Sequence, residues 1–147
     1  MQKIVIVANG APYGSESLFN SLRLAIALRE QESNLDLRLF LMSDAVTAGL
    51  RGQKPGEGYN IQQMLEILTA QNVPVKLCKT CTDGRGITGL PLIDGVLEAA
   101  AGKGTDALLR VVLALPHFLL LMGWKSVLLW NWRNGRCQPI KCSHFNV

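Results

Sequence analysis

The sequence predicts an α/β domain built around a small parallel sheet. A chain of 147 residues is the usual size of one domain, and with 48% apolar and 18% charged residues it can bury a core. Short apolar runs typical of strands alternate along the chain with segments of helical periodicity. That alternation is typical of βαβ units, whose right-handed crossovers make neighbouring strands parallel.

The first strand and first helix are expected within the first 34 residues. Residues 3–8 form a run rich in β-branched side chains, which is typical of a strand buried on both faces. Residues 9–14 are rich in turn formers and predict a loop. Ser15 is predicted to cap a helix, because apolar residues then recur at helical spacing until residues 30–34.

The remaining elements follow the same alternation. Residues 35–42 predict a second strand, and the glycine-rich residues 49–58 predict a mobile loop. Asn60 is expected to cap a second helix, residues 73–77 form a third strand, and residues 91–93 begin a fourth element. This order predicts a three-layer, flavodoxin-like domain.

Two cysteines stand where the third predicted strand ends. Cys78 and Cys81 have C-x-x-C spacing and enter the glycine-rich residues 82–86. The cations close to them in sequence are Lys76, Lys79 and Arg85. Because positive charge favours thiolate over thiol, the pattern predicts that Cys78 is reachable and ionised at neutral pH. An inert thiol at a strand end is the ordinary alternative, and for Cys81 both interpretations stay open.

The predicted topology also places the cysteines where a ligand site is expected. Parallel strands bring their carboxyl ends to one edge of the sheet, and open α/β sheets bind ligands there. Three loops share this edge, namely residues 9–15, the segment from Ser43 onward, and residues 78–86.

The motifs in this order resemble a known family. They are the loop Asn9-Gly10-Ala11-Pro12-Tyr13-Gly14-Ser15-Glu16, the glycine-rich loop to Gly58, Asn72-Val73-Pro74-Val75, and Cys78-x-x-Cys81-x-x-x-Arg85-Gly86-Ile87. Over roughly residues 1–95 they resemble the DsrE/DsrF-like family of small sulfur-relay proteins. The resemblance implies a compact DsrE-like fold, homo-oligomers (hexamers or trimers), and a cysteine that carries persulfide sulfur, which corresponds to Cys78.

A persulfide carrier needs a reachable thiolate and groups that hold the negative charge of the added sulfur. The predicted anion-binding residues are Tyr13, Ser15, Lys79, Arg85 and Gly86. Cys81 either resolves the persulfide as an internal disulfide or stabilises it. The partners implied are sulfur donor and acceptor proteins, and no cofactor is expected.

Two other classes of function stay open. The same pair could form a thiol–disulfide switch, although redox C-x-x-C motifs usually begin a helix, whereas this pair is expected to enter a loop. The domain could also be a non-catalytic module whose oligomer presents the loop edge to a ligand. Zinc is not predicted, because the gap between Cys81 and the later ligands Cys137, Cys142 and His144 matches no compact zinc motif.

Residues 96–147 depart from the family pattern and are not expected to form an independent domain. Residues 1–94 carry equal numbers of basic and acidic side chains, so the remainder supplies the whole formal charge of +4. We consider three accounts: an extension that packs on the sheet or a partner subunit, a membrane-associating segment, and an ending read from a shifted frame. The apolar stretch 111–124 is shorter than the ~20 residues of a spanning helix, so a membrane is not the expected partner.

The first 94 residues show no alternation of basic and aromatic side chains, so nucleic acid is not an expected partner. The apolar start of the chain is too short for a signal peptide, and a cytoplasmic location is therefore expected. That reducing compartment would keep both thiols free at rest.

Overall fold

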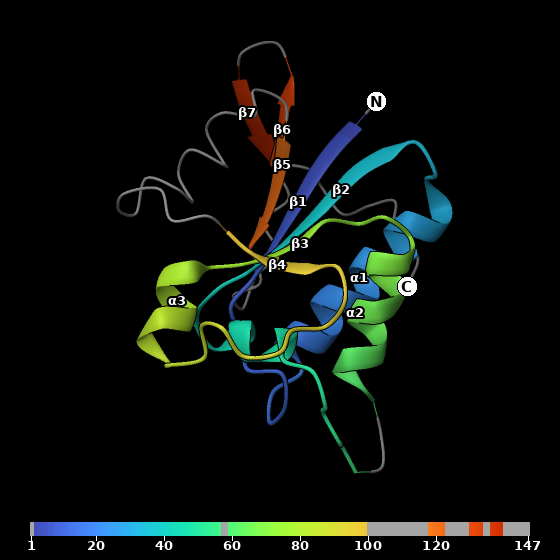
Figure 1. The fold of residues 1–147 in the computed structure, drawn as a ribbon. Helices are drawn as coiled ribbons and strands as arrows, with labels where there is room; N and C mark the ends of the chain where they lie inside the picture. Colours follow the sequence, from blue (N-terminus) through green and yellow to red (C-terminus); the bar gives the residue numbers. More distant parts are fainter. Residues whose placement is uncertain (1, 57–58, 100–117, 123–129, 134–135, 140–147) are drawn as a thin grey trace.

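The computed structural model describes residues 2–56, 59–99, 118–122, 130–133 and 136–139. The elements in order are β1 (Gln2–Ala8), α1 (Ser17–Gln31), β2 (Leu35–Leu41), the 3₁₀-helix η1 (Ser43–Gly49), α2 (Ile61–Ala70), β3 (Val75–Leu77), α3 (Lys79–Gly84), β4 (Val96–Glu98), β5 (Phe118–Met122), β6 (Trp130–Arg133) and β7 (Arg136–Pro139) (Figure 1).

The core of the fold is a five-stranded sheet in the order β4-β3-β2-β1-β5. Each neighbouring pair in it is parallel. Along its whole length β1 pairs with β2, from Gln2 opposite Leu35 to Ala8 opposite Leu41. The predicted parallel α/β fold is therefore confirmed, and all carboxyl ends of the strands meet at one edge.

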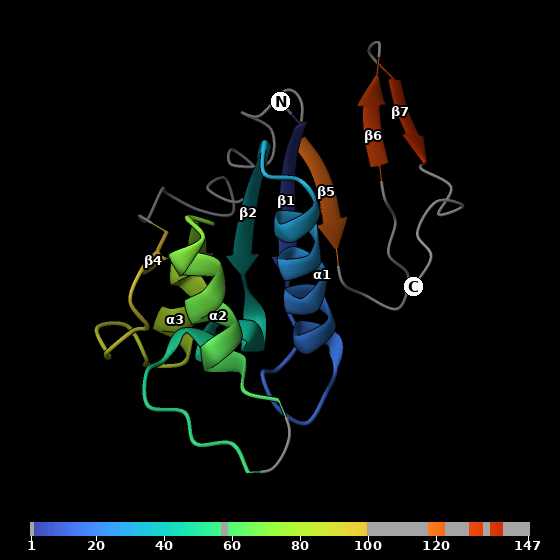
Figure 2. The same cartoon turned by 90° about the vertical axis from the view of Figure 1, so that its right-hand side faces the viewer.

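Helices α1 and α2 lie side by side against one face of the sheet (Figures 1 and 2). Their inward side chains recur at three- and four-residue spacing and are fully buried: Leu18, Leu22 and Ala25 in α1, and Ile61, Leu65 and Leu68 in α2. They pack against alternate residues of β1 and β2.

The opposite face of the central strands is apolar as well. Val5, Val7 and Phe40 are buried there, and Met42, Cys78 and Ala99 pack beside them. Because β1 sends alternate side chains into two apolar clusters, its predicted burial on both faces is confirmed. Cys78 touches both clusters, so the cysteine lies where the two halves of the core meet at the end of the sheet.

Three strands beyond residue 99 pair with described partners. Strand β5 runs parallel to β1, with Lys3 opposite Phe118 and Val7 opposite Met122, so that edge of β1 is paired. Strands β6 and β7 form an antiparallel pair. Among the described residues, no helix is both long and apolar enough to cross a membrane. Cys142 and His144, considered above as metal ligands, lie outside the described residues, and within these residues no cluster of metal-ligating side chains occurs.

The predicted element boundaries shift by a few residues. Glu16, not Ser15, stands at the cap position of α1, although the Ser15 hydroxyl oxygen accepts a hydrogen bond from the Ser17 N–H at 3.3 Å. Asn60 caps α2 as predicted, because its side chain accepts the N–H of Gln63. Strand β4 begins after the predicted segment 91–93.

Candidate functional site

Cys78 joins the sheet to helix α3. It follows β3 directly, and its N–H donates to the Leu41 carbonyl of β2 at 2.8 Å. It is also the N-cap residue of α3, and its carbonyl accepts the N–H groups of Cys81 and Thr82, both at 3.0 Å. The sheet therefore fixes the backbone of Cys78 on one side and the helix fixes it on the other.

The glycine loop predicted after Cys78 is wrong, because residues 79–84 form α3. Thr82 is fully buried, and its hydroxyl donates to the Lys79 carbonyl at 2.9 Å and accepts from the Thr88 hydroxyl at 3.0 Å. Burial of this side chain holds a turn that Gly84 and Gly86 alone would leave loose. The C-x-x-C pair thus begins a helix, and the argument raised above against a redox role fails.

The environment of Cys78 favours the neutral thiol. The residue is half-buried, and burial in apolar surroundings raises the pKa of its thiol above the ordinary value. The Cys81 side chain lies against it and raises the pKa further. The N–H groups of Cys81 and Thr80 lower the pKa, but by less. These surroundings work against the thiolate that the neighbouring cations in the sequence predicted.

The nearby cations do not reverse this shift, because two of them are paired with carboxylates. The Lys79 ammonium lies 2.6 Å from Asp83 Oδ1. Their contact raises the pKa of Lys79 and lowers the pKa of Asp83. The Arg85 guanidinium lies 2.7 Å from Asp44 Oδ1. Their positive charges are thus largely balanced before they can act on the thiol.

The sulfur of Cys81 has a specific donor that the sequence did not reveal. The main-chain N–H of Ser43 donates to Cys81 Sγ at 3.1 Å. Ser43 lies two residues after the end of β2 and has φ of 52°, in the left-handed region that residues with a Cβ rarely adopt. The only signal in the sequence was the position of Ser43 at the carboxyl edge of the sheet.

Three of the predicted anion-binding residues are engaged elsewhere. The Tyr13 hydroxyl donates to Gln53 Oε1 at 2.7 Å in the loop after η1. Ser15 turns back to its own helix, as described above. The N–H of Gly86 donates to the Asp83 carbonyl at 3.0 Å and so closes α3. The structure therefore places Cys78, Cys81, Lys79 and Arg85 along α3, from its N-cap to its C-cap, and it brings Ser43 and Asp44 against them.

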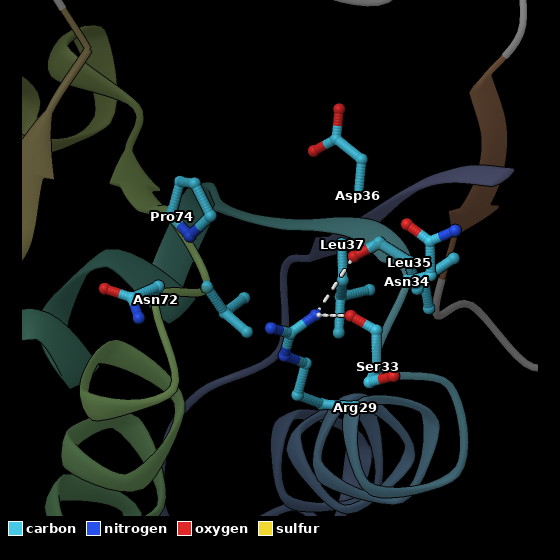
Figure 3. Close-up of a pocket in the computed structure, with 9 residues that line it drawn as sticks. Arg29, Ser33, Asn34, Leu35, Asp36, Leu37, Asn72 and Pro74 are labelled. Carbon is cyan, nitrogen blue, oxygen red and sulfur yellow. Dashed lines mark hydrogen bonds between the residues drawn. The ribbon is translucent and has the colours of Figure 1, made fainter. Parts of the chain in front are cut away.

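A surface hollow of about 330 Å³ lies at the other edge of the sheet, where β2 and β3 begin (Figure 3). In it, Arg29 Nη1 donates to the carbonyls of Ser33 and Leu35, at 3.0 and 3.2 Å. The guanidinium is thus used to tie the end of α1 to the start of β2. We do not regard this hollow as part of the cysteine site.

Together, the fold and the site define a class: a small parallel α/β protein with a cysteine pair at the carboxyl edge of its sheet. The sequence model of the DsrE/DsrF-like family matches residues 2–109, and the chain belongs to this family.

Named relatives agree with this assignment. Protein YchN of Escherichia coli strain K12 is 98% identical over 96 residues, which are 65% of this chain and 82% of that protein. An uncharacterised protein of the archaeon Methanopyrus kandleri is 38% identical over 94 residues, covering 63% of this chain and 75% of its own length.

Solved structures share the fold. The crystal structure of the ychN protein from E. coli superimposes with a TM-score of 0.73 at 81% identity and covers 82% of this chain and 99% of its own. A protein of unknown function from Methanobacterium thermoautotrophicum, MTH1491, gives a TM-score of 0.63 at 16% identity, with 83% and 99% covered. The second likeness concerns the fold alone.

Proposed function

We propose that this protein is a sulfur carrier of the sulfur-relay type, which holds a persulfide on Cys78. The observation that carries the proposal is the position of Cys78, half-buried at the carboxyl end of β3 and backed by a second cysteine one helical turn away. Family membership supports the relay role. Ligands of open α/β sheets bind at this edge, which is where a donor protein would have to reach the sulfur.

The loading step is an exchange between sulfur atoms. The Cys78 thiolate attacks the outer sulfur of a donor persulfide, forms Cys78–S–SH, and releases the donor as its thiolate, so that charge and atoms balance. The apolar side chains of Val7 and Phe40 form the cluster against which Cys78 packs. They would limit the access of water and stray thiols to the stored sulfur. Because the pKa of Cys78 is raised, loading is expected to be slow at neutral pH and faster in alkali.

Mass spectrometry of the intact protein tests the proposal. After incubation with a cysteine desulfurase and cysteine, we expect a gain of about 32 Da, the mass of one persulfide sulfur. The gain is expected to disappear in Cys78→Ala and to persist in Cys81→Ala, which serves as the matched control. Failure of several persulfide donors to add sulfur to residue 78 would refute the carrier role.

A second candidate is a thiol–disulfide switch that uses the same two cysteines. The start of α3 at Cys78 favours it, because redox C-x-x-C motifs usually begin a helix. Its mark would be a reversible Cys78–Cys81 disulfide with a measurable reduction potential, formed without any transfer of sulfur. The mass measurement separates the two, since oxidation removes two hydrogens and loading adds a sulfur.

We also propose that the protein is cytoplasmic and assembles as a trimer or hexamer. Donor and acceptor proteins would bind it at the loops along the carboxyl edge of the sheet. Self-association would use edge strand β4, where Leu97 is 61% exposed and a partner subunit could cover it. Light scattering of Leu97→Asp beside the unaltered protein tests this, and an unchanged mass would argue against this contact.

A further inference from the structure

The main chain is held in place on both sides of the contact between Ser43 and Cys81, first at Ser43 and then at Cys81. Ser43 lies between two main-chain hydrogen bonds that fix the turn, from Met42 N–H to the Ala8 carbonyl at 2.9 Å and from Ala45 N–H to the Met42 carbonyl at 3.1 Å. Its left-handed φ of 52° is a conformation that a serine keeps only when its surroundings impose it. The strained turn directs the Ser43 N–H at Cys81 Sγ, 3.1 Å away.

The other side of the contact is held by Arg85. One of its nitrogens, Nη1, donates to the Cys81 carbonyl at 3.1 Å, while Nε and Nη2 donate to Asp44 Oδ1 at 3.2 and 2.7 Å. Asp44 is the next residue after Ser43, so the same guanidinium fastens the donor segment and the acceptor segment to each other. An N–H fixed in this way holds the sulfur that it faces in one position.

The two cysteines therefore differ in kind. Cys78 borders apolar side chains of both core clusters. Cys81 packs against one cluster and receives a main-chain N–H. This difference predicts different roles for the two residues. The sulfur of Cys78 stores the persulfide, and the sulfur of Cys81 is placed to attack it.

We propose that Cys81 is the nucleophile that discharges the persulfide of Cys78, and that the Ser43 main-chain N–H is the positioning donor that holds its sulfur for the attack. This inference rests on the proposed carrier function. The Cys81 thiolate attacks Cys78 Sγ, the Cys81–Cys78 disulfide forms, and the bond to the outer sulfur breaks and releases hydrosulfide. Cys81 is oxidised, the outer sulfur is reduced to sulfide, and one negative charge stands on each side of the step.

Attack at the inner sulfur is favoured over transfer of the outer sulfur to Cys81. Transfer would expel the Cys78 thiolate, and a thiol whose pKa is raised by burial is a poor leaving group. Hydrosulfide, the base of a stronger acid, leaves more readily. The disulfide then requires a dithiol reductant to reset the pair, so without one each chain releases a single sulfide.

A discharge experiment tests the inference on the full-length protein. Cys78 is loaded with a desulfurase and cysteine, the donor is removed, and sulfide and intact mass are followed over time. The expected result is one sulfide per chain and a final mass about 2 Da below that of the reduced protein, for the two hydrogens lost in a disulfide. In Cys81→Ser the adduct should load normally and decay at least about tenfold more slowly, because a serine hydroxyl is a far weaker nucleophile than a thiolate.

Substitutions at Ser43 test whether its main-chain N–H positions the Cys81 sulfur. Ser43→Val keeps the N–H, but a β-branched side chain disfavours the left-handed backbone, so the N–H should shift and discharge should slow while loading stays the same. Ser43→Gly allows that backbone freely and should restore discharge relative to Ser43→Val. A merely structural role would change loading and discharge alike, and equal effects on both would count against the donor role.

The outcomes separate this inference from the function on which it rests. An adduct that decays as fast in Cys81→Ser as in the unaltered protein would overturn the inference and leave the carrier function standing. A protein that takes up no sulfur at residue 78 would overturn both. Release of sulfide together with the disulfide, lost in Cys81→Ser, would support both.

Discussion

Arg85 at the end of α3 and Asp44 near the start of η1, 41 residues apart in sequence, form an ion pair that uses a single carboxylate oxygen. Two guanidinium nitrogens of Arg85 donate to the same oxygen, Oδ1 of Asp44, at 3.2 and 2.7 Å. This pair fastens the turn after β2 to the helix that carries Cys81. The geometry of the cysteine pair therefore depends on a contact between η1 and the end of α3 as well as on the sheet.

The Asp44–Arg85 pair is expected to contribute little to global stability. Their side chains are 68% and 33% exposed, so solvent screens the attraction, and a double-mutant cycle should give a coupling free energy of about 0.2–1 kcal/mol. Urea unfolding of Asp44→Ala, Arg85→Ala and the double variant measures it. The coupling should shrink at high salt, because exposed charges are screened. A large coupling that salt does not alter would show that the pair is effectively buried.

The raised pKa of Cys78 sets the direction of its pH dependence. A thiol reacts as the thiolate, so alkylation of Cys78 by iodoacetamide should accelerate roughly tenfold per pH unit below its pKa. Because that pKa lies above the ordinary 9.0, the rate should still be rising at pH 9.0 instead of reaching a plateau. Peptide mapping of the alkylated protein follows the rate at each cysteine separately.

Cys81→Ala provides the matched variant for this titration. The Cys81 side chain is the second cause of the raised pKa, after burial, and its removal should move the pKa of Cys78 downward but not back to the ordinary value. A plateau well below pH 9.0 in the unaltered protein would mean that the cations, and not burial, control the thiol.

The fold was predictable because its signals are local. Apolar runs such as residues 3–8 and 35–42 and the cap at Asn60 specify the strands and α2 within a few residues of sequence. Helix α3 was missed because Gly84 and Gly86 favour a loop locally. The contacts that make it a helix, above all burial of the Thr82 side chain, exist only in the folded protein.

The site was predictable in its place but not in its electrostatics. The cysteines lie at the carboxyl edge as the topology required. Their charge environment depends on which carboxylate each cation meets, and Asp44 lies 41 residues from Arg85 in sequence. The left-handed backbone of Ser43 is a second such case, since nothing in the residue type announces a positive φ.

The Asn60 cap should contribute measurably to stability. Its side-chain oxygen accepts the Gln63 N–H at 3.2 Å and satisfies one of the free donors at the start of α2. Asn60→Ala should lower the free energy of unfolding by about 1 kcal/mol. Gln63→Ala is the control, because the substitution keeps the main-chain N–H and alters an exposed side chain. Equal losses in the two variants, measured by urea unfolding, would contradict the capping role.

Replacing Gly49 by a larger residue should destabilise the protein, because the Leu77 side chain lies directly against position 49. A Cβ at position 49 would lie 2.7 Å from Leu77 Cδ1 and 3.0 Å from Cδ2, and Leu77 is fully buried. Gly49→Ala should therefore lower the free energy of unfolding by about 1–3 kcal/mol through overpacking. Gly56→Ala, whose Cβ would meet nothing within 4 Å, is the control for the loss of a glycine.

The source of the Gly49→Ala effect can be located with a second substitution. If the clash with Leu77 is responsible, Leu77→Val should relieve part of it, and the double variant should lose less stability than the two single variants together. Because Leu77 is followed directly by Cys78, a displaced Leu77 should also change the rate at which Cys78 is alkylated. Additive losses in urea unfolding, with alkylation unchanged, would show that the overpacking is absorbed away from the cysteine site.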